Sequence, residues 1–98
     1  MDKIHYSTVG YVIASMYRYQ ILSFLNDSVK MPKEISKELN THFSQISTSL
    51  TELKKKKLVI CLNESRSKGR FYKATEHGKG VLKTIDELRI NTSNLQRK

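Results

Sequence analysis

Short polar side chains recur at helical spacing between residues 43 and 56 of the sequence. The positions that a helix there would turn outward carry hydroxyls, one amide and one carboxylate: Ser44, Gln45, Ser47, Thr48, Thr51 and Glu52. Short hydroxyls and an amide can closely approach the edges of nucleic-acid bases or their phosphates. A glutamine amide offers adenine both a donor and an acceptor, so Gln45 is the favoured base contact. The alternative is an ordinary solvated helix face.

Other residues of this segment have more specific candidate roles. Ser44 and Ser47, with the backbone amides at the start of the helix, suit phosphate oxygens. Thr48 could touch the methyl group of a thymine. His42, in the turn before the helix, is either a phosphate contact or simply a turn residue.

Basic side chains form a second group between residues 63 and 70. Arg66, Lys68 and Arg70 alternate around Ser67 and Gly69. Because side chains alternate along an extended segment, at least two of these basic groups can point together at a phosphate backbone. Gly69 is expected to close the tip of a hairpin. The alternative is a charged tip that only keeps a loop soluble.

Four consecutive lysines occupy residues 54–57. They span a full helical turn and cannot all face one way, so at least two of them are expected to face solvent. Lys54 or Lys55 is the favoured contact of this group with a phosphate backbone.

Groups that could support catalysis or metal binding are scattered along the chain. His5, His42 and His77 lie far apart, no nucleophile and base share a motif spacing, and no glycine-rich phosphate loop occurs. Cys61 is the one cysteine, so neither an intramolecular disulfide nor a multi-cysteine zinc site can form. We therefore expect no enzyme activity, no metal and no cofactor. In its apolar segment Cys61 is expected to be a core residue, since a redox role would need exposure.

Composition places these groups in a single basic domain, residues 1–98. The formal charge is +9, 38% of the residues are hydrophobic, and no stretch is apolar enough for a membrane span or a signal peptide. Residues 28–57 carry seven lysines against three glutamates, and residues 58–80 carry five basic groups against two acidic ones. Residues 1–27 are neutral. This asymmetry favours a polyanionic partner, nucleic acid first and an anionic membrane surface second, and the cysteine usage favours the cytoplasm.

Helical hydrophobic spacing predicts two pieces in the N-terminal quarter. Residues 15–25 form a helix with Ser15 as its N-cap. Residues 4–14 form either a separate short helix, which we favour, or a continuation of the same helix, and Gly10 is a weak point in both cases. Turn chemistry at residues 26–28 ends the second piece.

A helix-turn-helix follows in the predicted order. Residues 29–31 are extended, and Pro32 suits the first turn of a short helix that ends at Asn40. A three-residue turn leads to a longer helix over about 43–56. The inner face of that helix is predicted to carry Phe43, Ile46, Leu50 and Leu53.

A change of hydrophobic period then predicts a hairpin. Residues 58–62 and 70–74 read as strands around a polar loop. Thr75 is a good N-cap for a last helix, and the polar tail over residues 91–98 is expected to fray. The predicted fold class is α+β, mainly α.

Several fragments, taken in order, resemble the small winged-helix transcriptional regulators of archaeal type, which are allied to the MarR and ArsR groups. The resemblance covers about residues 11–85. The fragments are YVIASMYR at 11–18, QIL at 20–22, PKEI at 32–35, KEL at 37–39, ISTSL at 46–50, EL at 52–53, LV at 58–59, CLN at 61–63 and KGRFY at 68–72, with Thr75 and Gly78. The resemblance implies a winged helix-turn-helix that binds double-stranded DNA, usually as a homodimer. It places the helix at about 43–56 in the major groove and the wing, residues 63–70, over the backbone or the minor groove.

Two positions depart from the pattern of these regulators. Thr48 stands where relatives commonly carry arginine, which removes the commonest guanine contact and shifts or relaxes the preferred site. Lys57 stands where the pattern has glycine to close the helix in the left-handed conformation.

Apolar residues near both ends exceed what a bare winged-helix core needs, and we expect them to pair two copies. They are Tyr6, Tyr11, Val12 and Ile13 at one end and Leu82, Ile85, Leu88 and Ile90 at the other. The alternative is that they only cover the core of a monomer. Two further hypotheses remain beside a regulator: a non-specific architectural or nucleoid protein, and a winged-helix module for protein or RNA contacts.

Overall fold

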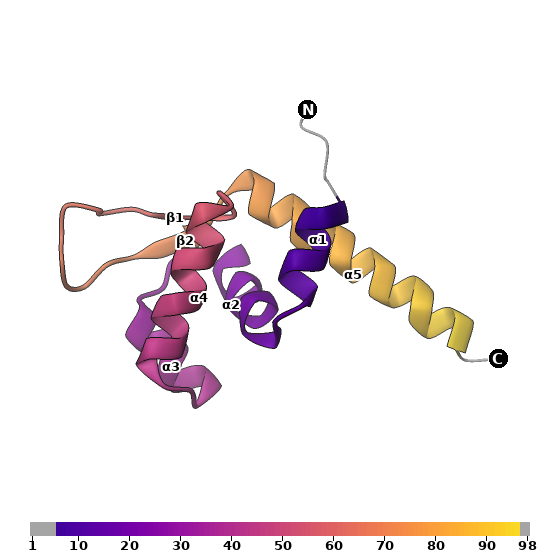
Figure 1. Cartoon of the computed structure of the whole chain (residues 1–98), viewed down its shortest axis with the longest axis horizontal. Coiled ribbons are helices and arrows are strands. Elements are labelled where there is room, and N and C mark those ends of the chain that lie inside the picture. The colour runs from indigo at the N-terminus through magenta and orange to yellow at the C-terminus, as the bar shows by residue number, and fades with distance from the viewer. Residues whose placement is uncertain (1–5, 97–98) are drawn as a thin grey trace.

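The computed structural model describes the backbone of residues 6–96 and the side chains of residues 6–89. Within this range, five helices and a two-stranded antiparallel hairpin follow one another along the chain (Figure 1). The elements are α1 Tyr6–Ile13, α2 Met16–Asn26, α3 Pro32–Leu39, α4 Phe43–Lys55, β1 Val59–Cys61, β2 Tyr72–Ala74 and α5 Glu76–Gln96. The architecture is the mainly helical α+β fold that the sequence predicts.

Local capping determines where the helices begin and end. The Ser15 hydroxyl accepts a hydrogen bond from the Arg18 amide at 3.4 Å and starts α2 as a separate helix from α1. Pro32 opens α3, and Asn40 closes it in the left-handed conformation at φ 51°. Gly10 lies inside α1 without interrupting it. The separate α1 and α2, the Ser15 cap and the end of α3 at Asn40 confirm the sequence predictions. Residues 4 and 5 of the first predicted helix lie outside the described residues.

The helix-turn-helix consists of α3, a short turn and α4. The Ser36 hydroxyl donates to the Thr41 carbonyl and ties the turn to α3. α4 packs against α2, α3 and β1, and its inner face buries Ile46, Leu50 and Leu53. α4 is therefore held from three sides, which fixes the direction of its outer face.

The hairpin is short and is anchored at its base. β1 and β2 pair with Cys61 opposite Tyr72, and the Leu62 amide extends the pairing to the Phe71 carbonyl at 2.8 Å. On the other side of β2, Lys30 and Tyr72 exchange two backbone hydrogen bonds of 3.1 and 2.9 Å. The extended segment before α3 thus joins the sheet. Each strand has three residues, fewer than the sequence predicts.

The core lies between the helices and the inner face of the hairpin. α5 closes it by packing on α1, α2 and β2, and the Gly78 amide donates to the Thr75 hydroxyl at 3.0 Å, which confirms Thr75 at the start of α5. Cys61 is buried here, as predicted. The largest fully buried side chains are Ile21, Leu22, Leu25, Ile35, Ile46, Leu50, Leu53, Leu58, Ile85, Val12, Val59 and Val81.

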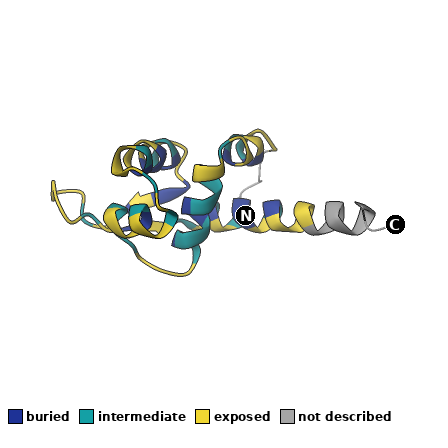
Figure 2. Ribbon diagram, turned by 90° about the horizontal axis from the view of Figure 1, so that it is seen from below, coloured by how far each residue is buried: buried dark blue, intermediate teal, exposed yellow. Residues whose placement is uncertain are grey.

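Three sequence predictions are wrong in this structure. α5 continues to Gln96, so most of the expected polar tail is helical (Figure 1). The described side chains of α5 change from buried to exposed along the helix (Figure 2). Val12, Leu82 and Ile85, assigned to spare surface, are buried in the core of the single chain. Phe43, assigned to the core, is 54% exposed because it lies at the first position of α4, before the inner face begins.

Candidate nucleic-acid interface

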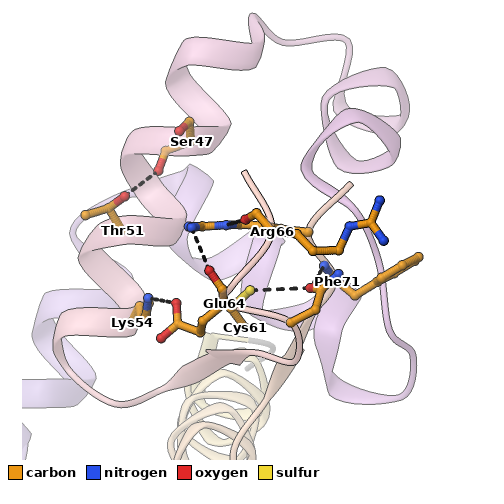
Figure 3. Close-up of polar contacts among 9 residues, drawn as sticks. Ser47, Thr51, Lys54, Cys61, Glu64, Arg66 and Phe71 are labelled. Carbon is orange, nitrogen blue, oxygen red and sulfur yellow. Dashed lines mark hydrogen bonds and ion pairs between the residues drawn. The ribbon is translucent and has the colours of Figure 1, made fainter. Parts of the chain in front are cut away.

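The outer face of α4 carries exposed hydroxyls, and its one charged residue before Lys54 is Glu52, which is half-buried and paired with Arg18. Ser44, Ser47, Thr48 and Thr51 are all exposed, and the Thr51 hydroxyl donates back to the Ser47 carbonyl at 3.0 Å (Figure 3). Small uncharged side chains let the helix approach a surface closely without repelling it. The face therefore has the chemistry expected of a helix that contacts base edges.

Gln45 and Glu52 are less exposed than a fully outward position would make them. Both are half-buried. Gln45 Nε2 donates to the hydroxyl of Ser49 at 3.2 Å, and Ser49 is fully buried between α4 and its neighbours. One end of the Gln45 amide is thus held against the helix, and its carbonyl oxygen is the end left to meet a ligand.

Lys54 forms an ion pair with the wing. Its ammonium donates to the carboxylate of Glu64 (Figure 3). This hydrogen bond raises the pKa of Lys54 and lowers the pKa of Glu64. The charge of Lys54 is therefore partly neutralised within the chain, whereas Lys55 is exposed and no ion pair is formed by its side chain within the described residues.

Asn63 organises the base of the wing. Its side-chain oxygen accepts from the Phe71 amide at 2.8 Å and from the thiol of Cys61 at 3.6 Å, and its side-chain amide donates to the Gly69 carbonyl at 3.0 Å. These contacts join both arms of the loop. The sequence predicts for Asn63 only a place in a polar loop, and its signal is the preference of asparagine for bonding to nearby backbone.

The three basic residues of the wing do not play the same part. The guanidinium of Arg70 donates to the carbonyls of Arg66 and, at 3.0 Å, Glu64, so it braces the loop from within. Arg66 and Lys68 are exposed at the tip, where Gly69 has φ 66° as a hairpin tip requires. Two basic side chains, not three, are presented outward.

Two open hollows flank the start of α4. One, of about 640 Å³, is lined by Tyr17, Ser36, Asn40, Thr41, His42 and Phe43. The other, of about 570 Å³, lies between α4 and the wing and is lined by Met31, Pro32, Lys33, Phe43, Ser47, Ser67, Lys68, Gly69, Arg70 and Tyr72. His42 is the N-cap residue of α4, and its side chain makes no capping bond. Its imidazole is thus available to a ligand in the first hollow.

A polar cluster behind α4 was not anticipated from the sequence. Arg18 of α2 stacks on the ring of Tyr11 at 3.9 Å and forms an ion pair with Glu52 of α4 at 3.3 Å. Lys56 approaches the same ring at 5.0 Å. α1, α2 and α4 are thereby tied together, and no local pattern signals contacts between residues so distant in sequence.

The described part of the chain offers neither a metal-binding cluster nor a membrane-spanning helix. No three His, Cys, Asp or Glu side chains come together there to hold a metal ion. None of the described helices has the length and apolarity to cross a membrane.

The architecture matches solved winged helix-turn-helix structures. The homodimeric DNA-binding domain of Mb0332 from Mycobacterium bovis, a possible ArsR-family transcriptional regulator, is 22% identical with a TM-score of 0.66 over 92% of this chain and 80% of that one. HlyU from Vibrio cholerae is 26% identical with a TM-score of 0.63 over 90% of this chain and 97% of that one. The adhesin competence repressor AdcR from Streptococcus pyogenes is 14% identical with a TM-score of 0.67 over 92% and 74%. No protein-family model and no curated protein sequence matches the chain.

These similarities define the class of fold. The chain has the winged helix-turn-helix fold of DNA-binding transcriptional regulators of the ArsR and MarR kinds, some of which are homodimeric. These three structures are bacterial, and the archaeal type that the sequence resembles stays a prediction.

Proposed function

We propose that this protein is a cytoplasmic transcriptional regulator that binds duplex DNA as a homodimer and has no enzyme activity. The observation that carries the proposal is the combination on one winged helix-turn-helix of an exposed, uncharged α4 face with a basic hairpin tip. A neutral face can enter the major groove and read bases, while basic groups beside it bind phosphates. α4 is the recognition helix of this proposal.

The exposed residues of α4 and the wing divide into two kinds of contact. Gln45, through its carbonyl oxygen, and Thr48 are the proposed base contacts. The proposed backbone contacts are His42, Ser44, Ser47, Thr51, Lys54, Lys55, Arg66, Lys68 and Arg70. Among these, Arg66, Lys68 and Lys55 contribute most, because Lys54 and Arg70 already have partners within the chain.

The proposed dimer uses the helices at the two ends of the chain, which lie side by side in the structure (Figure 1). After the core residues are removed from the predicted set, Tyr6, Ile13 and Leu88 remain at least 40% exposed, Tyr11 is half-buried, and the side chain of Ile90 lies outside the described residues. Met16, 72% exposed, adds to the surface near α1. A two-fold dimer would place two recognition helices about 34–36 Å apart, one DNA turn, on a roughly palindromic operator.

Selection of bound fragments from random duplex DNA tests the proposal. A regulator should enrich a two-half-site sequence and prefer it by about 10³-fold or more over random DNA. Enrichment without a motif would favour a non-specific architectural protein, and failure to retain any duplex at low salt would favour a protein or RNA interaction module. Light scattering that gives a monomer at micromolar concentration would remove the dimer.

Salt dependence tests the backbone contacts separately. Arg66→Ala combined with Lys68→Ala should flatten the log–log salt slope by about 0.9 for each phosphate that the protein no longer neutralises. The matched control is Lys79→Ala combined with Lys83→Ala, which removes the same charge from the exposed surface of α5. Equal flattening in both pairs would show that only net charge matters.

A further inference from the structure

Phe43 is an apolar side chain on the proposed DNA face that the core does not use. It is the first residue of α4 and is 54% exposed. Ile46, Leu50 and Leu53 fill the inner face of the helix without it. A single exposed hydrophobic residue is ordinary on a protein surface, so its meaning depends on where it lies.

The position of Phe43 is unusual because it borders both hollows that flank the start of α4. On one side lie the turn residues and His42. On the other side lie the wing tip and three basic residues, Lys33, Lys68 and Arg70. An exposed phenyl ring therefore stands between the two hollows. It lies at the end of the proposed recognition helix that approaches base edges in helix-turn-helix complexes.

The charge around Phe43 indicates which occupant the ring meets. A second copy of this chain would bring the same basic groups to the same place and would be repelled. Duplex DNA supplies phosphates for the basic rim of the wing-side hollow, where the hydroxyl of Ser47 also lies. The same duplex supplies an apolar group in its major groove, the C5 methyl of thymine.

We propose that Phe43 is a specificity-determining residue that contacts the C5 methyl of a thymine in each half-site. This inference rests on the proposed function. A phenyl ring has no hydrogen-bonding group, so it cannot read the donors and acceptors that distinguish the other bases. It favours the base pair that presents a methyl group and disfavours those that present only polar edges, which are desolvated without a partner.

Single-group changes in the DNA test this contact. Each thymine of the selected duplex is replaced in turn by deoxyuridine, which removes the methyl group and leaves base pairing intact. At one thymine position, the same in both half-sites, the wild-type protein should bind the deoxyuridine duplex about fourfold more weakly than the thymine duplex. This is the loss expected for one methyl group that is no longer buried. Phe43→Ala should bind the thymine and deoxyuridine duplexes equally at that position. Phe43→Gln, which keeps a long side chain, should behave in the same way.

Two control variants separate Phe43 from its neighbours. Phe71→Ala removes a phenylalanine of similar exposure, 41%, that borders neither hollow, and it should keep the full deoxyuridine penalty. Thr48→Ser removes the only other side-chain methyl group proposed to face the bases, and it should also keep the penalty. A penalty that disappears in Thr48→Ser and persists in Phe43→Ala assigns the methyl contact to Thr48 and overturns the inference.

The remaining outcomes separate the role of Phe43 from the function on which it rests. If wild type binds its selected duplex but is insensitive to every deoxyuridine, the inference alone is wrong. If wild type retains no duplex at low salt, the proposed function fails and the inference fails with it. If Phe43→Ala and Phe43→Gln both unfold, Phe43 supports the fold and the inference is again overturned.

Discussion

Arg18 lies with its guanidinium 3.9 Å from the centre of the Tyr11 ring and donates to the Tyr11 carbonyl at 2.7 Å. The same guanidinium reaches Glu52 on α4. One side chain of α2 therefore connects α1, part of the proposed dimer surface, to the recognition helix. Its side chain is 17% exposed, so these contacts are shielded from solvent more than a surface ion pair is.

Arg18→Ala should lower the free energy of unfolding by about 1–3 kcal/mol, because it removes a stacked cation and a charged hydrogen-bond donor together. Urea denaturation followed by circular dichroism measures the change. Arg89→Ala is the control, since Arg89 stacks on Tyr19 at 4.2 Å but is exposed, and its removal should cost less. Equal destabilisation in the two variants would contradict a special role for Arg18.

Lys57→Gly should raise the free energy of unfolding by on the order of 1 kcal/mol and the melting temperature by about 4–8 °C. Lys57 has φ 62°, a strained conformation for a residue with a side chain. Its amide and that of Leu58 satisfy the last carbonyls of α4, at Lys54 and Leu53, so the conformation is required. DNA binding should weaken slightly because one positive charge is removed.

Asn40→Gly provides the control for Lys57→Gly. Asn40 closes α3 at φ 51°, but asparagine tolerates this conformation and should gain little from replacement. An unchanged or lower melting temperature of Lys57→Gly would count against the left-handed helix end.

Glu64→Gln should strengthen DNA binding at low salt and steepen the salt slope by about 0.9, because it releases Lys54 to meet a phosphate. Fluorescence anisotropy with labelled duplex measures both quantities. Glu76→Gln removes an acidic group that pairs with Lys79 on α5 and should leave the slope unchanged. A similar change of the salt slope in both variants would show that the effect comes from net charge and not from the release of Lys54.

The same ion pair gives stability a weak pH dependence. Because folding lowers the pKa of Glu64, the pair stabilises the fold above the pKa of an unfolded glutamate, about 4.3. That contribution is lost as the pH falls through the lowered pKa. Folding raises the pKa of Lys54, so Lys54 stabilises the fold at pH values below the pKa of an unfolded lysine. This stabilisation is lost as the pH rises through the raised pKa of Lys54 in the folded protein. Carboxyl NMR titration should find the Glu64 pKa closer to its ordinary value in Lys54→Met.

Gly78→Ala should destabilise the fold by about 1–3 kcal/mol, because its Cβ would lie 2.1 Å from the Leu58 carbonyl oxygen. Gly10→Ala should instead stabilise it by about 0.5–1 kcal/mol, because a Cβ there meets nothing within 4 Å and the residue lies inside α1. Thermal unfolding of both variants should show a lower melting temperature for Gly78→Ala and a higher one for Gly10→Ala. Destabilisation by Gly10→Ala would show that this face of α1 is covered in the dimer.

Local signals explain which parts of the fold were predictable. Ser15, Asn40 and Lys57 act through the backbone within a few residues, so sequence reveals them. Val12 and Leu82 could cover either the chain's own core or a second copy. The outcome depends on how α5 packs against α1, and no local sequence pattern encodes that packing.

The candidate site was predicted in outline and not in its internal contacts. The hydroxyl face of α4 follows from helical period, and the exposed wing tip from Gly69 and its basic neighbours. The partners of Lys54, Arg70 and Gln45 follow from tertiary geometry. Phe43 was misplaced because hydrophobicity at helical spacing predicts burial, and the first turn of a helix can project beyond the core.

The two hydrogen bonds between Lys30 and Tyr72 couple the base of the wing to the segment that leads into α3. We therefore expect the wing and the helix-turn-helix to move as one body, with only the tip beyond Asn63 left to adjust. A protein built in this way would hold a fixed span between its two proposed DNA contacts. The duplex must match that span through its twist and groove width, so we expect sequences to be discriminated by shape as well as by their bases.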